Sequence, residues 1–448
     1  MTEPEKNSQN DFMIEKIKER PINKKKLIRR TVTTAAMAVI FGLIACVTFL
    51  LLEPVISNWL HPEEEPAPIV FPEDQEEMSP EDMLSENITP ENSGEQDNPV
   101  LEQNQIQEIL EGVVLDRDNY KQIYSDLSAY VSELNHSMVT VTGVSSNIDW
   151  FNDVEESKNQ ASGVVIANNN KNLLVLADYS PLKKAESLTM TFSYLDGTTG
   201  RNISVPAELK DQDPTSGLAV ISVNLSDIPA EIMESENGIQ IAPLGSSNVR
   251  NIIGTPVIAL GSPMGSNGSV GYGMISAVGS QNSQADTNYK YLQTDIYGSQ
   301  NAGGVLFNLQ GQVIGMITGQ KSGLDLKNSV AAIGISEIKK SVEKMSNGEK
   351  IAYLGINGID VTDEAYEELG VPYGAFVKDV EMNSPSMQAG IQQGDVLVDF
   401  EGRSIRNYND YITALMQAEA GSTVNLKVMR AAMGEYKEMN IRVTLDER

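Results

Sequence analysis

The chain has 448 residues, and its 33 Lys and Arg against 62 Asp and Glu give a formal net charge of −29 at pH 7. A surface this acidic repels phosphate backbones, so we expect no nucleic-acid partner. The length is sufficient for two or three domains with hydrophobic cores of their own.

A basic cluster near the N-terminus, Lys24 to Arg30, precedes an uncharged apolar run over residues 31–52. About 20 such residues cross a bilayer as a helix. Because basic residues stay on the cytoplasmic side, we expect residues 1–30 to be a cytoplasmic tail and everything after residue 52 to be extracytoplasmic, in a single-pass cell-membrane protein. A cleavable signal peptide is the alternative, but the long polar lead and the lack of a small-residue cleavage site favour an uncleaved anchor.

The only cysteine, Cys46, lies inside this apolar run, so no intrachain disulfide can form. We expect neither a metal nor a cofactor. Residues 53–100 contain no Lys or Arg and are rich in Glu and Pro. Such a segment repels itself and buries little, which predicts an extended linker or stalk. Binding of cations or basic partners is the alternative use of this segment.

Residues 101–136 show helical spacing of apolar residues. A first piece runs from Ile106 to Val114, and a second runs from Tyr120 to Leu134. From residue 137 to 337 short β-branched runs alternate with turn residues, which predicts an all-β domain. The clearest predicted strands are Val139–Val141, Gly163–Ile166, Leu173–Leu176, Leu218–Ile221 and Val257–Leu260. Asn168–Asn170 and Asp196–Gly197 are predicted as hairpin turns.

Residues 338–350 are predicted to form a helical connector, and residues 351–448 form a last segment with its own motifs. These motifs are Tyr353-Leu354-Gly355-Ile356, Gly374-Ala375-Phe376-Val377, Ser384-Pro385 to Gly390-Ile391, and Gly394-Asp395-Val396-Leu397. Their succession resembles the PDZ domain of HtrA-type proteins. The resemblance implies that the Tyr353–Ile356 loop binds a carboxylate.

The segment Gln293–Gly315 resembles the nucleophile segment of trypsin-like proteases of the HtrA (DegP-like) family, which reads Q-T-D, a short loop, G-N-S-G-G-P-L-x-N and G-x-V-I-G. Further anchors in the same order and spacing support this. They are Ala161-Ser162-Gly163, Leu218-Ala219-Val220, Leu260 to Gly265 and Gly273 to Ala277. The resemblance implies a mainly β protein, a trypsin-like double β-barrel followed by a PDZ domain, with an N-terminal single transmembrane helix.

The catalytic positions of that family are replaced in this chain. Ala302 stands where the family has its nucleophilic serine, Tyr179 where it has the histidine, and Gly217 where it has the aspartate. A methyl group cannot attack a carbonyl, and a tyrosine with a pKa of about 10 is a poor base near neutral pH. Gln300 replaces a glycine of the oxyanion loop and disfavours a left-handed backbone there. We therefore predict a catalytically degenerate member, a pseudoprotease.

Two routes to a relocated active site stay open. Of the two histidines, His61 lies in the linker, and His136 is either a relocated base or, as we expect, a surface or capping residue. Ser299 or Ser276 could pair with Lys183 or Lys184, although no motif supports such a dyad. Asp213, the outer acid of the replaced motif, is expected to cap a turn.

For the PDZ segment the resemblance implies a binding function. The loop Tyr353, Leu354, Gly355 and Ile356 would present backbone N–H groups to a peptide's terminal carboxylate, and the peptide would add as a strand beside the next one. Apolar side chains at Leu354 and Ile356 would line the pocket for the last residue, and a helix around 408–418 would form the other wall. The alternative is that these residues only complete the domain's core.

The resulting hypothesis is a membrane-anchored adaptor, regulator or chaperone-like scaffold in envelope protein quality control, binding C-terminal or unfolded polypeptide segments. The implied assembly is a homotrimer or a mixed oligomer with an active paralogue. Tyr120 and Tyr124 could contribute to a trimer, but we expect them to pack in the core. The first alternative is a serine-type endopeptidase, with an unconventional nucleophile or completed by that paralogue. The second is a structural envelope protein.

Overall fold

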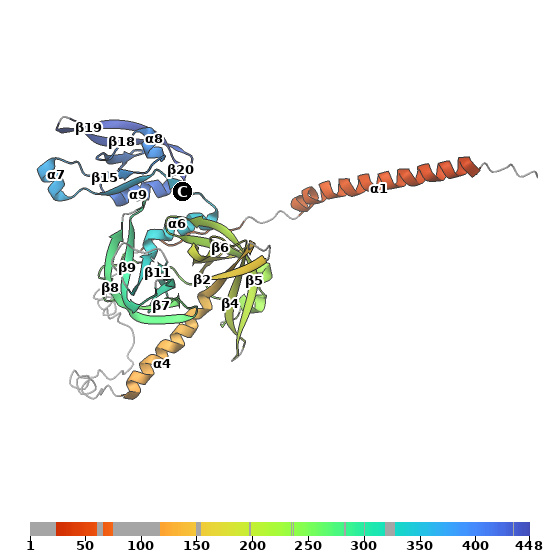
Figure 1. The fold of residues 1–448 in the computed structure, drawn as a ribbon, viewed down its shortest axis with the longest axis horizontal. Helices are drawn as coiled ribbons and strands as arrows, with labels where there is room; N and C mark the ends of the chain where they lie inside the picture. The colour runs from red at the N-terminus through yellow and green to blue at the C-terminus, as the bar shows by residue number, and fades with distance from the viewer. Residues whose placement is uncertain are drawn as a thin grey trace, which may run out of the picture. The chain divides into compact units, whose positions relative to one another are not determined.

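The computed structural model describes residues 24–60, 66–74, 117–148, 154–196, 199–233, 235, 237–281, 284–299, 301–318, 328–432 and 434–448 (Figure 1). The chain divides into two compact units, residues 1–65 and residues 66–448, and each is described by itself. The apolar helix predicted from Ile106 to Val114 lies outside the described residues, as does Gln300.

The first unit contains one long helix, α1 (Lys24–Leu60). Its stretch Val32–Phe49 has the length and composition needed to cross a membrane. Side chains along this stretch are exposed, with Phe41 at 76% and Met37 at 70%. Because a long helix with apolar side chains on its surface is stable in the hydrocarbon of a bilayer, α1 is a candidate membrane span. It extends beyond both ends of the predicted 31–52 segment.

The second unit begins with residues 66–74 and then helix α4 (Arg117–Leu134), which leads through a short 3-10 turn η1 (Asn135–Ser137) into the first barrel. Helix α4 buries only its last turn, through Val131 and Leu134. Near its start, Tyr120 and Tyr124 are exposed, and their ring centroids lie 4.9 Å apart, so the expectation that they pack in the core is wrong.

A closed six-stranded antiparallel barrel follows, with the strand order β1-β2-β3-β6-β5-β4. Its strands are β1 (Met138–Ile148), β2 (Val154–Asn168), β3 (Asn172–Asp178), β4 (Ser187–Asp196), β5 (Thr199–Asp213) and β6 (Leu218–Asn224). Short helical turns η2 (Ser180–Leu182), η3 (Leu225–Asp227) and α5 (Ala230–Met233) flank it. The predicted turn at Asn168–Asn170 joins β2 to β3, and Asn170 adopts the left-handed φ of 68° that asparagine tolerates.

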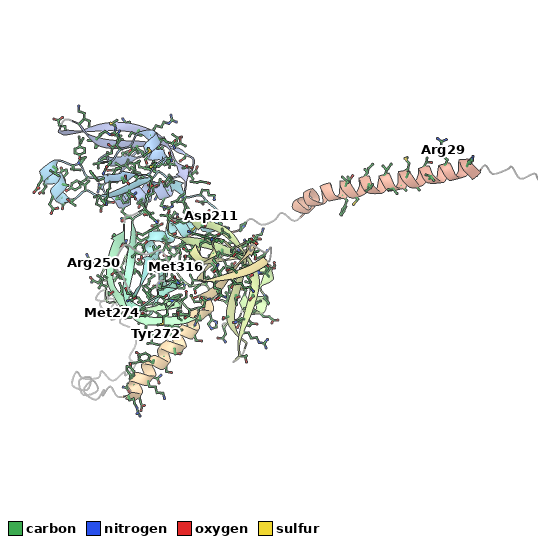
Figure 2. The ribbon with its side chains drawn as sticks, in the orientation of Figure 1. Arg29, Asp211, Arg250, Tyr272, Met274 and Met316 are labelled. Carbon is green, nitrogen blue, oxygen red and sulfur yellow. The ribbon has the colours of Figure 1, made fainter. Side chains whose placement is uncertain are left out.

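The second barrel is also closed and has the order β10-β11-β12-β9-β8-β7. Its strands are β7 (Pro256–Ser262), β8 (Ser269–Gln281), β9 (Tyr289–Tyr297), β10 (Gly303–Asn308), β11 (Val313–Ile317) and β12 (Ser329–Gly334). Side chains of β8 alternate as a half-buried strand requires: Ile275 is buried, whereas Tyr272 and Met274 are 40% and 47% exposed. Met316 lies on β11, whose residues are all buried (Figure 2). The predicted trypsin-like double barrel is confirmed.

Helix α6 (Ile335–Asn347) leaves the second barrel and ends at Gly348, whose left-handed φ of 73° closes the last turn. It begins at Ile335 rather than at the predicted 338. Its apolar face joins a core that the two barrels share, and this core includes Met416 of the last domain. The buried Lys344 ammonium donates to the backbone oxygen of Ala418 at 2.9 Å, so α6 holds the barrels and the last domain together.

The last domain has its own core and a sheet in the order β14-β15-β16-β18-β19, with β17 beside β16. Its elements are β13 (Ala352–Tyr353), β14 (Ile356–Asp360), α7 (Asp363–Leu369), β15 (Ala375–Val380), α8 (Pro385–Ala389), β16 (Val396–Phe400), β17 (Arg403–Ser404), α9 (Tyr408–Gln417), β18 (Thr423–Ala432), β19 (Glu435–Thr444) and β20 (Asp446–Glu447). Strand β14 stands at the edge of the sheet, which is the position that strand addition requires. The predicted PDZ fold is confirmed.

Candidate functional site

Tyr179 and Gly217 are neighbours at one end of the first barrel. Tyr179 follows β3, and its backbone N–H donates to the oxygen of Gly217 at 2.9 Å. Gly217 has a φ of 73° and donates its own N–H to the oxygen of Asp213 at 2.9 Å. A left-handed backbone favours glycine, so the local turn itself explains the residue at this position.

Ala302 stands immediately before β10 of the second barrel. Its N–H donates to the oxygen of Ser299 at 3.1 Å, which closes a tight turn. Gly304 has a φ of 127°, and a side chain there would place a Cβ 2.1 Å from the Leu260 oxygen. Gly304 is therefore required by the fold of the barrel.

A cleft of about 640 Å³ is lined by residues of both barrels. It is lined by Gln160, Ala161, Ser162, Asp178, Ser180, Pro181, Lys183, Ser262, Gly265, Asn267, Asn301, Ala302 and Gly303. Ala302 thus faces the same space as the two residues that flank Tyr179, while Tyr179 packs against the core of the first barrel. The lining contains several hydroxyls, one amine and one carboxylate but no imidazole.

The serines of this cleft act as hydrogen-bond donors. Ser262 Oγ donates to the oxygen of Gly303 at 3.1 Å, and Ser162 Oγ donates to Asn267 Oδ1 at 3.4 Å. Within the described residues no hydrogen bond joins Ser276 or Ser299 to Lys183 or Lys184; Ser276 Oγ instead donates to the Gln293 oxygen at 3.2 Å. The relocated Ser–Lys pair stays an untested alternative.

The expectation of a surface position for His136 is wrong. The ring is 9% exposed, and Nδ1 lies 3.0 Å from the oxygen of Gly238. His136 does lie at a helix–strand junction, in the turn η1. Burial follows because this turn enters the barrel beside the 237–239 segment, a tertiary contact that sequence spacing does not indicate.

Asp213 caps its turn as predicted, accepting the Thr215 N–H at 3.0 Å. The structure adds an ion pair that the sequence did not indicate: Arg448 Nε lies 3.2 Å from Asp213 Oδ1, and both side chains are buried. Tyr289 also donates its hydroxyl to Asp213 at 3.1 Å. Burial, together with the Asp213 charge, raises the pKa of Tyr289 well above its ordinary value, so this hydroxyl stays protonated and remains a donor.

A second site lies at the start of the PDZ domain. The backbone N–H groups of Leu354, Gly355 and Ile356 converge on the carboxylate of Asp286, at 2.7, 2.7 and 3.1 Å. Asp286 belongs to the second barrel, in the segment between β8 and β9, and is fully buried. Burial raises the pKa of the Asp286 carboxyl, and these N–H donors and the Tyr411 hydroxyl oppose that rise. No pattern around residue 286 in the sequence indicated this role.

The loop is tightly built around Gly355, which has a φ of 87°. A Cβ there would lie 2.3 Å from the Cβ of Ser384. The side chains of Leu354 and Ile356 are buried in the PDZ core, at 0% and 1% exposure. Burial and the nearby Asp286 carboxylate raise the pKa of Tyr353 to about 12. A cavity of about 640 Å³ reaches this region, with Asp286, Glu337 and Met416 in its lining.

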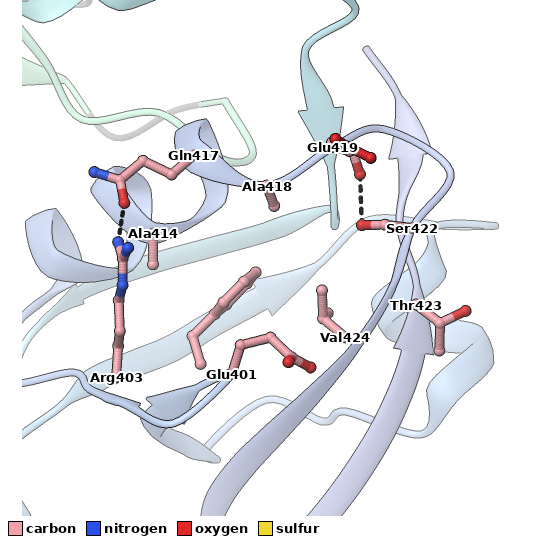
Figure 3. A pocket seen from close by; sticks show the side chains of 10 residues that line it. Glu401, Arg403, Ala414, Gln417, Ala418, Glu419, Ser422, Thr423 and Val424 are labelled. Atoms are coloured by element: carbon pink, nitrogen blue, oxygen red, sulfur yellow. Dashed lines mark hydrogen bonds between the residues drawn. The ribbon is translucent and has the colours of Figure 1, made fainter.

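A smaller pocket of about 410 Å³ lies elsewhere on the PDZ domain, between the end of β16, the end of α9 and the start of β18 (Figure 3). The Arg403 guanidinium in it donates to Gln417, and Ser422 Oγ donates to the Glu419 oxygen at 2.6 Å. Its lining shares no residue with the 353–356 loop, so it is separate from the carboxylate site.

Comparisons with known proteins agree with this geometry. Residues 161–316 match the Trypsin-like peptidase domain, and residues 352–445 match the PDZ domain. The chain is 32% identical, over 54% of its length and 49% of the relative's, to a probable periplasmic serine endoprotease DegP-like from Marinomonas sp. (strain MWYL1). It is 26% identical, over 72% of its length and 73% of the relative's, to the serine protease Do-like HtrA of Bacillus subtilis (strain 168).

A solved structure of the HtrA-type protease AlgW with a decapeptide superposes with a TM-score of 0.50 at 20% identity, covering 71% of this chain and 98% of that one. At this identity the likeness concerns the fold alone. The chain spans about half the length of the DegP-like relatives it matches. Together these findings support a trypsin-like peptidase domain and a PDZ domain arranged as in HtrA-type proteins.

Proposed function

We propose that this protein is a membrane-anchored, non-hydrolytic relative of HtrA-type proteases that captures C-terminal or unfolded segments of exported polypeptides through its PDZ domain. The observation that carries the proposal is Ala302. It stands at the start of β10 on the wall of the interbarrel cleft, where a nucleophile would be needed, and offers a methyl group.

Among the described residues, the cleft lining contains no imidazole, and Lys183 is its one amine. Acyl transfer by a serine needs a base within hydrogen-bond reach. The chain has only two histidines; His136 is hydrogen-bonded to Gly238, and His61 lies outside the described residues. Tyr179 and Gly217, at the positions implied for the base and its acid, supply neither function near neutral pH.

The PDZ domain supports the binding half of the proposal. Three convergent N–H groups form a concave anion site, which is how carboxylates are captured by backbone. The HtrA-type protease AlgW was solved with a decapeptide, and we carry peptide binding to this chain on that basis. Residues Tyr353, Leu354, Gly355 and Ile356 are the proposed contacts.

For location we propose an anchor in α1 with residues 1–30 cytoplasmic and the barrels and PDZ domain outside the cytoplasm. The basic residues before the apolar stretch support this orientation. Residues 53–100 would act as a spacer. A role in envelope quality control follows from the binding of exported chains, and assembly as a homotrimer or with an active paralogue is part of the same proposal.

The second candidate is a serine-type endopeptidase, the activity named for the relatives. It is favoured by the cleft that the barrels retain and by the Lys183 amine and several hydroxyls in its lining. A structural envelope protein is the third candidate, and it predicts that the PDZ loop is dispensable.

The test of catalysis exposes the full chain, in lipid nanodiscs, to a fluorophosphonate probe and to casein. We expect no labelling and no cleavage above a buffer control. Labelling that disappears in a Ser162→Ala or Ser262→Ala variant would establish the endopeptidase alternative instead.

The test of binding uses a pull-down of exported proteins by the same full chain, with a matched pair of glycine variants. Gly355→Ala places a methyl group against Ser384, whereas Gly370→Ala changes a glycine with a similar φ of 64° that has open space around it. We expect Gly355→Ala to lose the captured polypeptides and Gly370→Ala to keep them. Equal capture by both variants would favour the structural alternative.

A further inference from the structure

The segment before β9 places a carboxylate where a ligand's carboxylate would bind. Asp286 accepts the N–H groups of Leu354, Gly355 and Ile356, and it accepts the Tyr411 hydroxyl as well. No other described carboxylate accepts hydrogen bonds from this loop. The anion site of the PDZ domain is therefore filled by a residue of the same chain.

The backbone of Asp286 also behaves like that of a bound peptide. Its N–H donates to the oxygen of Ile356 at 2.9 Å, which is a main-chain contact to the first residue of the edge strand β14. A peptide that adds to a sheet edge makes its contacts through such main-chain bonds. Asp286 thus reproduces both halves of the expected recognition, the carboxylate and the adjoining N–H.

The groove beside β14 is closed in the same arrangement. Gly358 of β14 lies directly under Tyr408 of α9, since a Cβ on Gly358 would be 2.4 Å from the Tyr408 ring. The Tyr408 hydroxyl donates to the oxygen of Ile356 at 2.8 Å, the same oxygen that Asp286 uses. A peptide strand has no room between β14 and α9 until these contacts separate.

The backbone of Asp286 is held in place by its surroundings. Its φ is 56°, in the left-handed region that glycine, asparagine and aspartate adopt more readily than other residues. Arg448 donates to the Asp286 backbone oxygen at 3.3 Å while its guanidinium also pairs with Asp213. The neighbouring Ala285 and Thr287 are buried too.

We propose that Asp286 is an internal ligand of the PDZ domain, so that a polypeptide ending in a free carboxylate binds only when Asp286 leaves the loop. This inference rests on the proposed function and adds its regulation. Capture of a polypeptide end is then coupled to release of the 284–288 segment, between β8 and β9, from the loop.

The test measures binding of a fluorescent library of decapeptides with free C-termini to the full chain in nanodiscs, by anisotropy, with the C-terminally amidated library beside it. Asp286→Asn keeps the size of the side chain but removes its charge. The matched control is Asp295→Asn, which removes an exposed carboxylate of the same barrel that accepts one N–H, from Met274 at 2.7 Å. Thermal unfolding of each variant checks that it is folded.

We expect Asp286→Asn to bind the free-carboxylate library at least about tenfold more tightly than the unaltered chain, because the fraction of open loop rises. Asp295→Asn should match the unaltered chain, and the amidated library should bind weakly to all three. Equal, measurable binding by the unaltered chain and Asp286→Asn would overturn this inference and leave the proposed function intact. Failure of every folded protein to bind either library would instead overturn the proposed function.

Hydrogen exchange provides a readout that needs no substitution. Saturating free-carboxylate library should speed amide exchange in residues 284–288 of the unaltered chain, since that segment loses its contacts with the loop. Binding without any change in residues 284–288 would contradict the coupling. This arm also covers the case in which Asp286→Asn fails to fold.

Discussion

The interbarrel cleft at Ala302 and the carboxylate loop at Gly355 differ in what each retains. The cleft keeps a space of about 640 Å³ but presents a methyl group where a nucleophile would act. The loop keeps all three of its N–H donors, but the Asp286 carboxylate fills the space in front of them. The cleft is thus open but has a methyl group at position 302, whereas the loop has its hydrogen-bond donors but is filled by Asp286.

This difference shows why the two sites call for different experiments. Emptying the loop needs only a conformational change, because the binding groups are already in place. Restoring the cleft needs new side chains at several positions of both barrels. The loop therefore calls for a test of opening, whereas the cleft calls for substitutions and an assay of labelling.

The largest expected effect comes from Asp213. Its backbone oxygen accepts the N–H of Gly217, and its carboxylate pairs with Arg448, which also donates to the backbone oxygen of Asp286. Asp213→Ala leaves a buried guanidinium unpaired, so the free energy of unfolding should fall by about 3–5 kcal/mol. Urea unfolding at pH 7 measures this. The control is Glu438→Gln, in the exposed pair with Lys427 at 3.7 Å, which should change the free energy by less than about 0.5 kcal/mol. Equally small losses of unfolding free energy in both variants would mean that the Asp213–Arg448 pair contributes little to stability.

The second prediction concerns Glu337, which shares a cavity with Asp286. Burial, with a smaller contribution from Asp74, raises the pKa of Glu337 to about 7, although Lys290 opposes the shift. When the pKa of a carboxyl is raised in the folded state, its protonation stabilises the fold at low pH. For Glu337 this contribution is fully present below pH 4.5, the ordinary pKa, and is lost as the pH rises through about 7.

Glu337→Gln removes this titration. The stability of the variant relative to the unaltered chain should therefore rise by up to about 3 kcal/mol between pH 4.5 and pH 8. Thermal unfolding at a series of pH values measures it, with Glu349→Gln, just after the end of α6, as the control. A constant difference across this pH range would mean that the pKa of Glu337 is not raised in the folded protein.

A smaller effect is expected where the cleft's acid would be restored. Gly217→Asp places a side chain on a backbone with a φ of 73°, so it should cost about 1 kcal/mol of stability. Gly200→Asp, at an exposed strand position with open space, is the control for adding a charge. A neutral or stabilising Gly217→Asp would indicate that the turn accepts the acid and that its loss was not forced by the backbone.

The smallest effect is predicted for Ala302→Ser. The new hydroxyl would face the cleft without a base, because Tyr179 follows β3 in place of a histidine. Fluorophosphonate labelling should stay at the level of the unaltered chain. Labelling of this single variant would mean that Lys183 or another group already serves as the base.

The sequence alone predicted the architecture well, since strand alternation, turn residues and family motifs all act locally. The turn at Asn168–Asn170, the strands around Leu173–Leu176 and the helix ending at Leu134 lie where the pattern places them. These features depend on period and turn chemistry, which neighbouring residues encode.

The contacts that matter most for regulation could not be predicted. Asp286 meets Gly355 across 69 positions, and Arg448 meets Asp213 across 235, and nothing near any of these residues encodes the pairing. The burial of His136, which was expected to be a surface or capping residue, likewise depends on the distant Gly238. Such pairings arise only once the barrels and the PDZ domain have packed together.

The most direct test of the account follows the fate of bound peptides. The full chain in nanodiscs would be incubated with the free-carboxylate decapeptide library, and mass spectrometry would quantify the peptides recovered from the protein and from solution. We expect the peptides to bind through their C-terminal carboxylates and to be recovered intact. Shortened peptides whose appearance is abolished by Ser162→Ala or Ser262→Ala would contradict it.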